Sequence, residues 1–149
     1  MYLMTAVFSK VQDVLENYKT SVYEKDVEKF LSMYAPEMRI YDCWGNWEVK
    51  DLSLWKNNVA EWFNGLNEEG VLLKVDFHDL VVEEDISLAF VYCTVTFTAR
   101  LAEGGEQLRQ MSNRFTYGLK KVNESWFIAH EHSSLPISVE TGKGIYNIE

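Results

Sequence analysis

The hydrophobic period of the chain changes once, near Gly70. Before that point, apolar residues recur every three or four positions, which is the stripe of an amphipathic helix. After it, the chain consists of long runs rich in Val, Ile, Thr and aromatic residues, which favour strands. Helices followed by an antiparallel meander predict an α+β domain, in which the sheet must curl over the helices to bury one face.

Three helices are expected in the first half of the chain. The first carries apolar residues at helical spacing over 5–22. The second begins at Asp26, an N-cap residue, and ends before Pro36, because the residue that precedes proline avoids the helical region. The third begins after Asp51 and continues until Gly65 and a turn at residues 67–70. Two short extended segments are expected between the last two helices, at residues 38–44 and 47–50.

Four longer strands are expected at residues 71–83, 87–102, 106–122 and 126–139. Short polar segments join consecutive runs, as they do in hairpins. The sequence contains no internal repeat and no composition break up to residue 139, so we expect a single domain at 1–139. Residues 140–149 contain Gly142 and Gly144 and are expected to form a loosely held tail.

The charge of the chain limits its partners. It has 14 Lys and Arg against 23 Asp and Glu, a formal charge of −9 at pH 7, which argues against nucleic-acid binding and against anionic membranes. The two cysteines fit no ligand spacing and are interpreted as reduced thiols. The N-terminus has no basic leader, and no segment approaches the ~20 apolar residues of a membrane span. We therefore expect a cytoplasmic protein.

The chain carries an excess of aromatic residues. Five Trp, eight Tyr and eight Phe are more large flat side chains than one small core usually uses, and such residues also line pockets and interfaces. Four of the tryptophans cluster around the short strands and the third helix, namely Trp44, Trp47, Trp55 and Trp62. They either pack in the core and a dimer interface or form a flat-walled slot for an aromatic or polycyclic ligand.

Asp42 is the first candidate for chemistry, because it lies between the apolar pairs 40–41 and 43–44. If Asp42 faces the interior, loss of solvation favours its protonated form and makes its carboxylate more basic. Such a group suits removal of a proton from a carbon acid. The alternative is a turn aspartate that accepts hydrogen bonds from backbone amides before Gly45.

The last strand and its neighbour carry further candidates. Strict strand alternation predicts one face formed by Trp126, Ile128, His130, His132 and Ser134. The two histidines then point the same way and line a pocket or shuttle a proton; without a third fixed ligand, we expect no metal and no other cofactor. Arg114 lies on an apolar strand and needs a carboxylate, either from Glu131 or Asp42 or from a ligand.

The order of elements resembles the nuclear transport factor two-like superfamily, whose members are conical α+β folds. Within it, the segment DVEKFLSMYAPEMRIYDCWG is similar to the ketosteroid isomerase pattern. That resemblance implies that Asp42 is the general base, that Tyr34 belongs to the pocket and that Tyr18 donates a hydrogen bond to the developing enolate. The second acid of those isomerases falls at Tyr117 or Gly118 here, so the resemblance does not extend to steroid isomerisation itself.

The segment SNRFTYGLKKVNESWFIAHEHSSLP resembles the SnoaL-like branch and the calcium/calmodulin-dependent kinase association domain. The shared positions are Arg114, Trp126, His130, His132, Ser134 and Pro136. The resemblance implies either an enzyme or a module that binds a small acid or assembles into oligomers.

The sequence therefore predicts a cone of three helices on a strongly curved, mainly antiparallel sheet, with a pocket for a small carbonyl compound or carboxylate. The expected catalytic residues are Asp42, Tyr18 and His130, and the expected substrate-binding residues are Tyr34, Trp44, Trp47, Arg114, Trp126 and His132. An isomerase, cyclase or dehydratase would use such a site, and the alternative is a non-catalytic acid-binding or oligomerisation domain. A homodimer is expected through an outer sheet face that carries Phe90, Tyr92 and Phe127.

Overall fold

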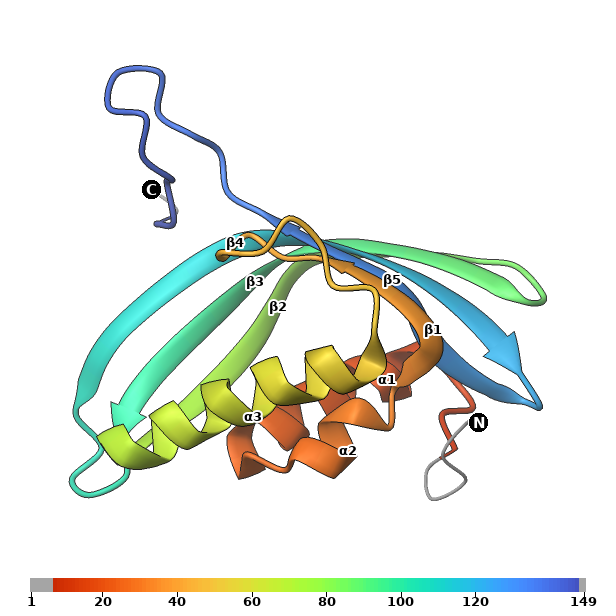
Figure 1. Ribbon diagram of the computed structural model, residues 1–149, viewed down its shortest axis with the longest axis horizontal. Coiled ribbons are helices and arrows are strands. Elements are labelled where there is room, and N and C mark those ends of the chain that lie inside the picture. The colour runs from red at the N-terminus through yellow and green to blue at the C-terminus, as the bar shows by residue number, and fades with distance from the viewer. Residues whose placement is uncertain (1–6, 148–149) are drawn as a thin grey trace.

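The computed structural model describes residues 7–147 and contains one five-stranded sheet that arches over three helices (Figure 1). The strands are β1 (Tyr34–Tyr41), β2 (Val71–Glu84), β3 (Leu88–Leu101), β4 (Gln107–Val122) and β5 (Ser125–Ser134). Their order in the sheet is β1-β5-β4-β3-β2, with β1 parallel to β5 and every other pair antiparallel. The predicted α+β cone with a curved, mainly antiparallel sheet is confirmed.

The helices are α1 (Val11–Glu24), α2 (Val27–Leu31) and α3 (Leu52–Glu69). Asp26 caps α2 by accepting a hydrogen bond from the Lys29 amide at 3.0 Å, and Asp51 caps α3 through the Ser53 amide at 2.7 Å. The first helix was expected from residue 5; residues 5 and 6 lie outside the described residues, and residues 7–10 are not helical. Among the described residues, no helix combines the length and hydropathy that a membrane crossing requires.

Aromatic side chains fill much of the core between the helices and the concave face of the sheet. The Tyr18 ring of α1 packs on Phe30 of α2 at 5.1 Å between ring centroids, and on Phe115 and Tyr117 of β4 at 6.3 Å. Edge and tilted contacts of this kind are the favoured geometries for aromatic pairs. Part of the aromatic excess is therefore core.

A β-bulge in β5 decides which side chains face that core. Gly118 of β4 pairs with His130, but the next residue pairs with Ile128, so Ala129 is an extra residue in the strand. The alternation therefore shifts by one position at Ala129. The prediction from strict alternation, which placed both histidines on the same face as Trp126, was wrong: Trp126 and Ile128 face the core, but so does Glu131, and His130 points outward.

The C-terminal segment folds back toward the sheet. The strand expected over 126–139 ends at Ser134, and the segment then turns through a bridge between Ile137 and Gly144. The Ser112 amide of β4 donates a hydrogen bond to the Tyr146 carbonyl at 2.7 Å. This hydrogen bond ties the expected loose tail to the part of β4 that β5 does not reach.

Candidate functional site

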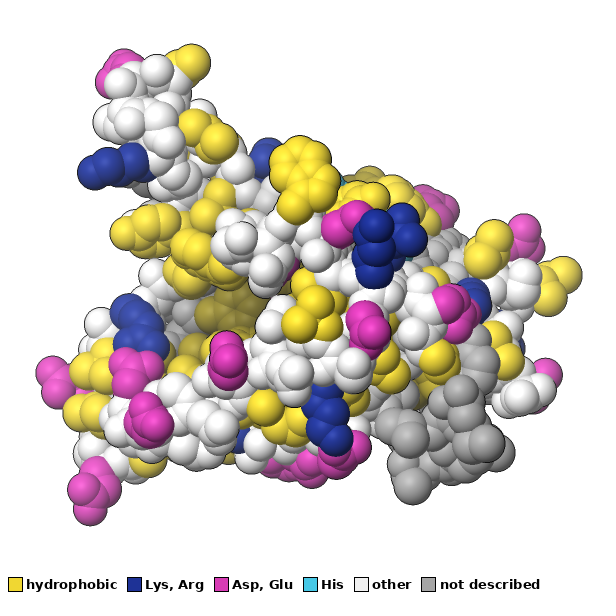
Figure 2. All heavy atoms as spheres, in the orientation of Figure 1, with side chains coloured by type: hydrophobic (Ala, Val, Ile, Leu, Met, Phe, Trp, Pro, Cys, Tyr) yellow, Lys and Arg dark blue, Asp and Glu magenta, His cyan; other side chains and the backbone are white. Residues whose placement is uncertain are grey.

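A cavity of about 700 Å³ lies between α3 and the concave face of the sheet. Its walls are mainly apolar and include Trp55 and Trp62 from α3, Phe97 from β3 and Phe115 from β4. Figure 2 shows the hollow, with hydrophobic side chains on its floor. The volume and the apolar walls suit a small, flat molecule.

Polar side chains from different parts of the chain line this cavity. Among them are Tyr18 from α1, Asp42 from the loop after β1, Asn113 from β4 and Glu131 from β5. The sequence predicted that Asp42 and Tyr18 share a site, and the structure brings both to this cavity. Trp44, from the same loop as Asp42, also lines it.

Asp42 is half-buried and held by hydrogen bonds. The Ser133 hydroxyl donates to its Oδ1 at 3.2 Å and accepts from the Cys43 amide at 3.0 Å. Burial raises the pKa of Asp42, whereas hydrogen bonds from the Ser133 hydroxyl and the amides of Trp44 and Cys43 partly lower it. The two interpretations of Asp42 thus combine, because the carboxylate lies against backbone amides and also lines the cavity.

Glu131 is the buried acid of the site, with 4% of its surface exposed. The Tyr34 hydroxyl donates a hydrogen bond to its Oε1 at 2.6 Å. Burial raises the pKa of Glu131 to about 8; the Tyr34 hydrogen bond lowers it, and the nearby Asp42 charge raises it. Glu131 is therefore mainly protonated at neutral pH and carries an acidic proton at the cavity wall.

From the sequence, Glu131 was expected only as a partner for Arg114. Glu131 pairs across the sheet with Tyr117, one of the two positions where the isomerase pattern places its second acid. A buried carboxyl group on the adjacent strand thus lies beside one of these positions. Strict alternation did not predict that Glu131 faces the core, because Glu131 turns inward only through the bulge at Ala129.

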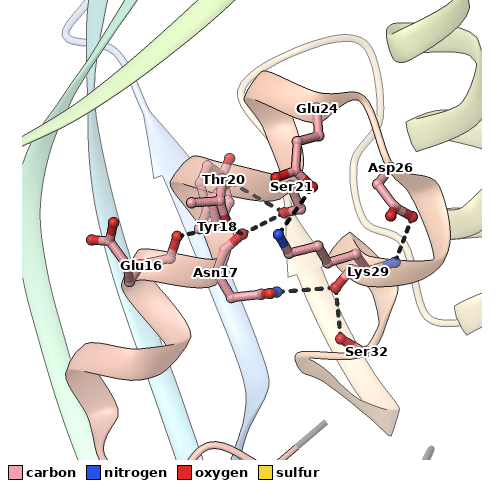
Figure 3. A network of polar contacts seen from close by, with 9 residues as sticks. All are labelled: Glu16, Asn17, Tyr18, Thr20, Ser21, Glu24, Asp26, Lys29 and Ser32. Atoms are coloured by element: carbon pink, nitrogen blue, oxygen red, sulfur yellow. Dashed lines mark hydrogen bonds and ion pairs between the residues drawn. The ribbon is translucent and has the colours of Figure 1, made fainter. Parts of the chain in front are cut away.

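Tyr18 lies beside both carboxyl groups. Its pKa is raised well above the ordinary value, first by burial and then by the charges of Glu131 and Asp42, so its hydroxyl stays protonated and can donate. Polar contacts between α1 and α2 hold this part of α1 (Figure 3). The Asn17 side chain donates to the Lys29 carbonyl at 3.0 Å, and the Ser32 hydroxyl donates to the same carbonyl at 2.6 Å.

The structure does not bring three predicted residues to the cavity. His130, His132 and Arg114 all lie on the outer face of the sheet, on the opposite side from the lining residues. His130 makes a 2.7 Å hydrogen bond through Nδ1 with the Arg39 carbonyl, and the Tyr41 ring packs against both histidines.

Three other predicted residues are also placed away from the lining. Trp47 is 94% exposed, and Trp126 is buried in the core. Tyr34 acts on the site through its hydrogen bond to Glu131. Among residues 7–147, no cluster of three or more His, Cys, Asp or Glu side chains is arranged to hold a metal ion.

The fold and its internal cavity define a cone of the nuclear transport factor two-like class. The family model described as a SnoaL-like domain matches residues 11–138, and the chain belongs to that family. The family resemblance deduced from the sequence is thus confirmed. No curated protein matches this chain.

Solved structures support the fold. An NTF2-like protein of unknown function from Pseudomonas putida KT2440 matches with a TM-score of 0.78 and 18% identity over 95% of this chain and 94% of that chain. Aln2 from a Streptomyces species matches with a TM-score of 0.74 and 13% identity, over 83% and 86% of the two chains. A putative calcium/calmodulin-dependent protein kinase II association domain from Xanthomonas campestris matches with a TM-score of 0.69 and 18% identity, over 90% of this chain and 95% of that chain. At these identities, the likeness concerns the fold alone.

Proposed function

We propose that this protein is an enzyme that moves a proton at the carbon next to a carbonyl group, as an isomerase, a cyclase or a dehydratase does. The observation that carries the proposal is the pair of carboxyl groups in one aromatic cavity. Glu131 holds its proton at neutral pH, while Asp42 is solvated by a hydroxyl and two amides. Carboxyl groups whose environments separate their pKa values are typical of acid and base partners.

In the proposed step, the Asp42 carboxylate takes the proton from the α-carbon, the electron pair of the C–H bond forms a C=C bond to the carbonyl carbon, and the π pair of the C=O bond moves to the oxygen. The resulting enolate oxygen accepts a hydrogen bond from Glu131 or Tyr18, which are both protonated. Asp42 then returns the proton to the same carbon or to another one. The step uses neither His130 nor Arg114, because both lie on the outer face.

The aromatic walls supply binding rather than chemistry. Trp55 and Trp62 on α3 and Phe97 on β3 form an aromatic wall, with Trp62 and Phe97 in edge contact at 6.3 Å between ring centroids, and Trp44 lies at the exposed side of the cavity. A planar carbonyl compound of one to three rings would bury most of its surface against these side chains.

The proposal is tested with 2-tetralone, a flat bicyclic ketone with acidic α-protons. We expect the protein to accelerate exchange of these protons for deuterium in D2O above the buffer rate, as followed by proton NMR. Exchange is common to isomerisation, cyclisation and dehydration by this route, so the assay does not require the natural substrate. A rate equal to that of buffer, for this ketone and for one-ring and three-ring analogues, would contradict the proposal.

We also propose that the protein is a homodimer that pairs through the outer sheet face. On this face, Gly118 of β4 lies between Phe90 of β3 and His130 of β5. Because Gly118 has no side chain, a groove runs over β4 between the side chains of Phe90 and His130. Phe90 is 50% exposed, and Tyr92 is exposed beside it. Phe127, expected on the same surface, is only 3% exposed within one chain and is not available for pairing.

Light scattering tests the homodimer. We expect twice the chain mass for the wild type and the monomer mass for Phe90→Glu, because a charge in the centre of an apolar interface loses its solvation. Leu54→Glu adds the same charge to an exposed position on α3, on the helical side of the molecule, and should remain dimeric. A monomeric wild type would contradict the proposal.

A further inference from the structure

The cavity has one positively charged side chain at its rim. Arg109, near the start of β4, lines the cavity and is half-exposed, and among the lining residues that the structure describes it is the only Lys or Arg. Glu69, at the end of α3, pairs with it: Nη1 and Nη2 of Arg109 donate to the two Glu69 oxygens at 2.8 and 2.6 Å. Figure 2 shows a basic and an acidic side chain next to each other at the rim of the hollow.

The pairing with Glu69 leaves Arg109 with unused donors. A guanidinium has five N–H groups, and a two-bond contact through Nη1 and Nη2 uses one from each nitrogen. The Nε–H group and the remaining Nη–H groups make no other hydrogen bond within residues 7–147. Arg109 is therefore able to bind a second carboxylate along its Nε edge without losing Glu69.

The two ends of the cavity differ in charge, with Arg109 at one end and Asp42 at the other. Arg109 and Asn113 are four residues apart on this strand, which at the rise of a β-strand separates them by roughly 13 Å. The Asn113 side chain donates to Cys43 Sγ at 3.4 Å, next to Asp42, so Asn113 marks the acidic end. An anionic ligand group is repelled by Asp42 at that end, whereas at the other end the unused N–H donors of Arg109 can bind it, with the charge of Arg109 partly offset by Glu69.

We propose that Arg109 binds a carboxylate of the ligand and that the substrate is a flat carbonyl compound with its carboxylate at the end opposite the reacting carbon. The carbonyl end of this assignment rests on the proposed function, whereas the carboxylate end rests on Arg109. Because the formal charge of −9 repels anions, a carboxylate ligand would depend on a local positive group such as Arg109.

Two matched probes test this inference, namely 6-acetyl-2-naphthoate and its methyl ester, which differ in one charge. We expect titration calorimetry on the wild type to give about tenfold tighter binding of the acid at low salt. Raising NaCl from about 20 mM to about 500 mM should reduce this preference, because Arg109 is half-exposed and therefore screened. Arg109→Gln should bind the acid as weakly as the ester, with its ester affinity unchanged.

Two further variants sharpen the test. Arg100→Gln on the neighbouring strand removes an equivalent charge outside the cavity lining and should keep the preference. Glu69→Gln removes the competing carboxylate and should tighten binding of the acid alone, which tests Arg109 even if Arg109→Gln fails to fold. Equal wild-type affinities for acid and ester, or a preference that survives Arg109→Gln, would overturn this inference only. Failure of both probes to bind would also count against the proposed function.

Discussion

Asp42→Asn lowers the rate of deuterium exchange into 2-tetralone by about 10²–10⁴-fold, the range that a positioned general base contributes. The amide has the size and shape of the carboxylate, and its oxygen still accepts the hydrogen bond from Ser133, so the cavity keeps its form. What the variant loses is the basic oxygen that receives the proton. The measurement is the exchange rate by proton NMR at fixed protein concentration, with the buffer rate subtracted.

Asp85→Asn is the matched control for this loss. Asp85 is an exposed acid in the turn between β2 and β3, where its side chain accepts a hydrogen bond from the Ile86 amide, and it does not line the cavity. The control should exchange 2-tetralone at the wild-type rate. Equal rates for Asp42→Asn and the wild type would remove Asp42 from the mechanism.

Glu131→Gln changes how both activity and stability depend on pH. In the wild type, exchange activity should fall as pH rises through about 8, where Glu131 loses the proton that it donates to the enolate. The glutamine amide donates at every pH and still accepts the hydrogen bond from Tyr34. The decline above pH 8 should therefore be absent from Glu131→Gln, and a decline of equal size in both proteins would contradict the assigned role.

The stability effect has a definite sign. Burial raises the pKa of Glu131 from 4.5 to about 8, so between these values the folded protein binds more protons than the unfolded chain. The free energy of unfolding of the wild type therefore falls as pH rises through this window, by up to about 1.4 kcal/mol per pH unit from this group. Urea unfolding should give a flatter pH dependence for Glu131→Gln, whereas the exposed control Glu106→Gln should keep the wild-type slope.

Local sequence signals predicted the starts of α2 and α3, whereas β1 begins at Tyr34, earlier than the extended segment expected at 38–44, and the segment expected at 47–50 forms only a bridge between Val49 and Ile40. Asp26 and Asp51 cap helices because their side chains accept backbone hydrogen bonds, and Gly70 ends α3 at a φ of 70°, which glycine adopts without strain. These effects involve neighbouring residues only. The placing of Tyr18 and Asp42 in one site came from the resemblance to the ketosteroid isomerase pattern and not from a local signal.

The remaining site residues depend on the register between strands, which no local pattern carries. Ala129 has no signature of a bulge, yet it reverses the faces of His130 and Glu131. Arg109 reaches the cavity because the curved sheet brings the start of β4 opposite the end of α3. Its partner Glu69 is forty residues away in the chain, and neither residue carries a signal of the contact.

The proposed mechanism requires that the cavity hold one protonated and one ionised carboxyl group at neutral pH. Carbon-13 NMR of the side-chain carboxyl carbons measures the protonation state of each group directly. The variants Asp42→Asn and Glu131→Gln assign the signals. The structure predicts that Glu131 titrates near pH 8 and that burial raises the pKa of Asp42 above its ordinary value. Titration of Glu131 near 4.5, which would leave both groups ionised at neutral pH, would contradict the mechanism.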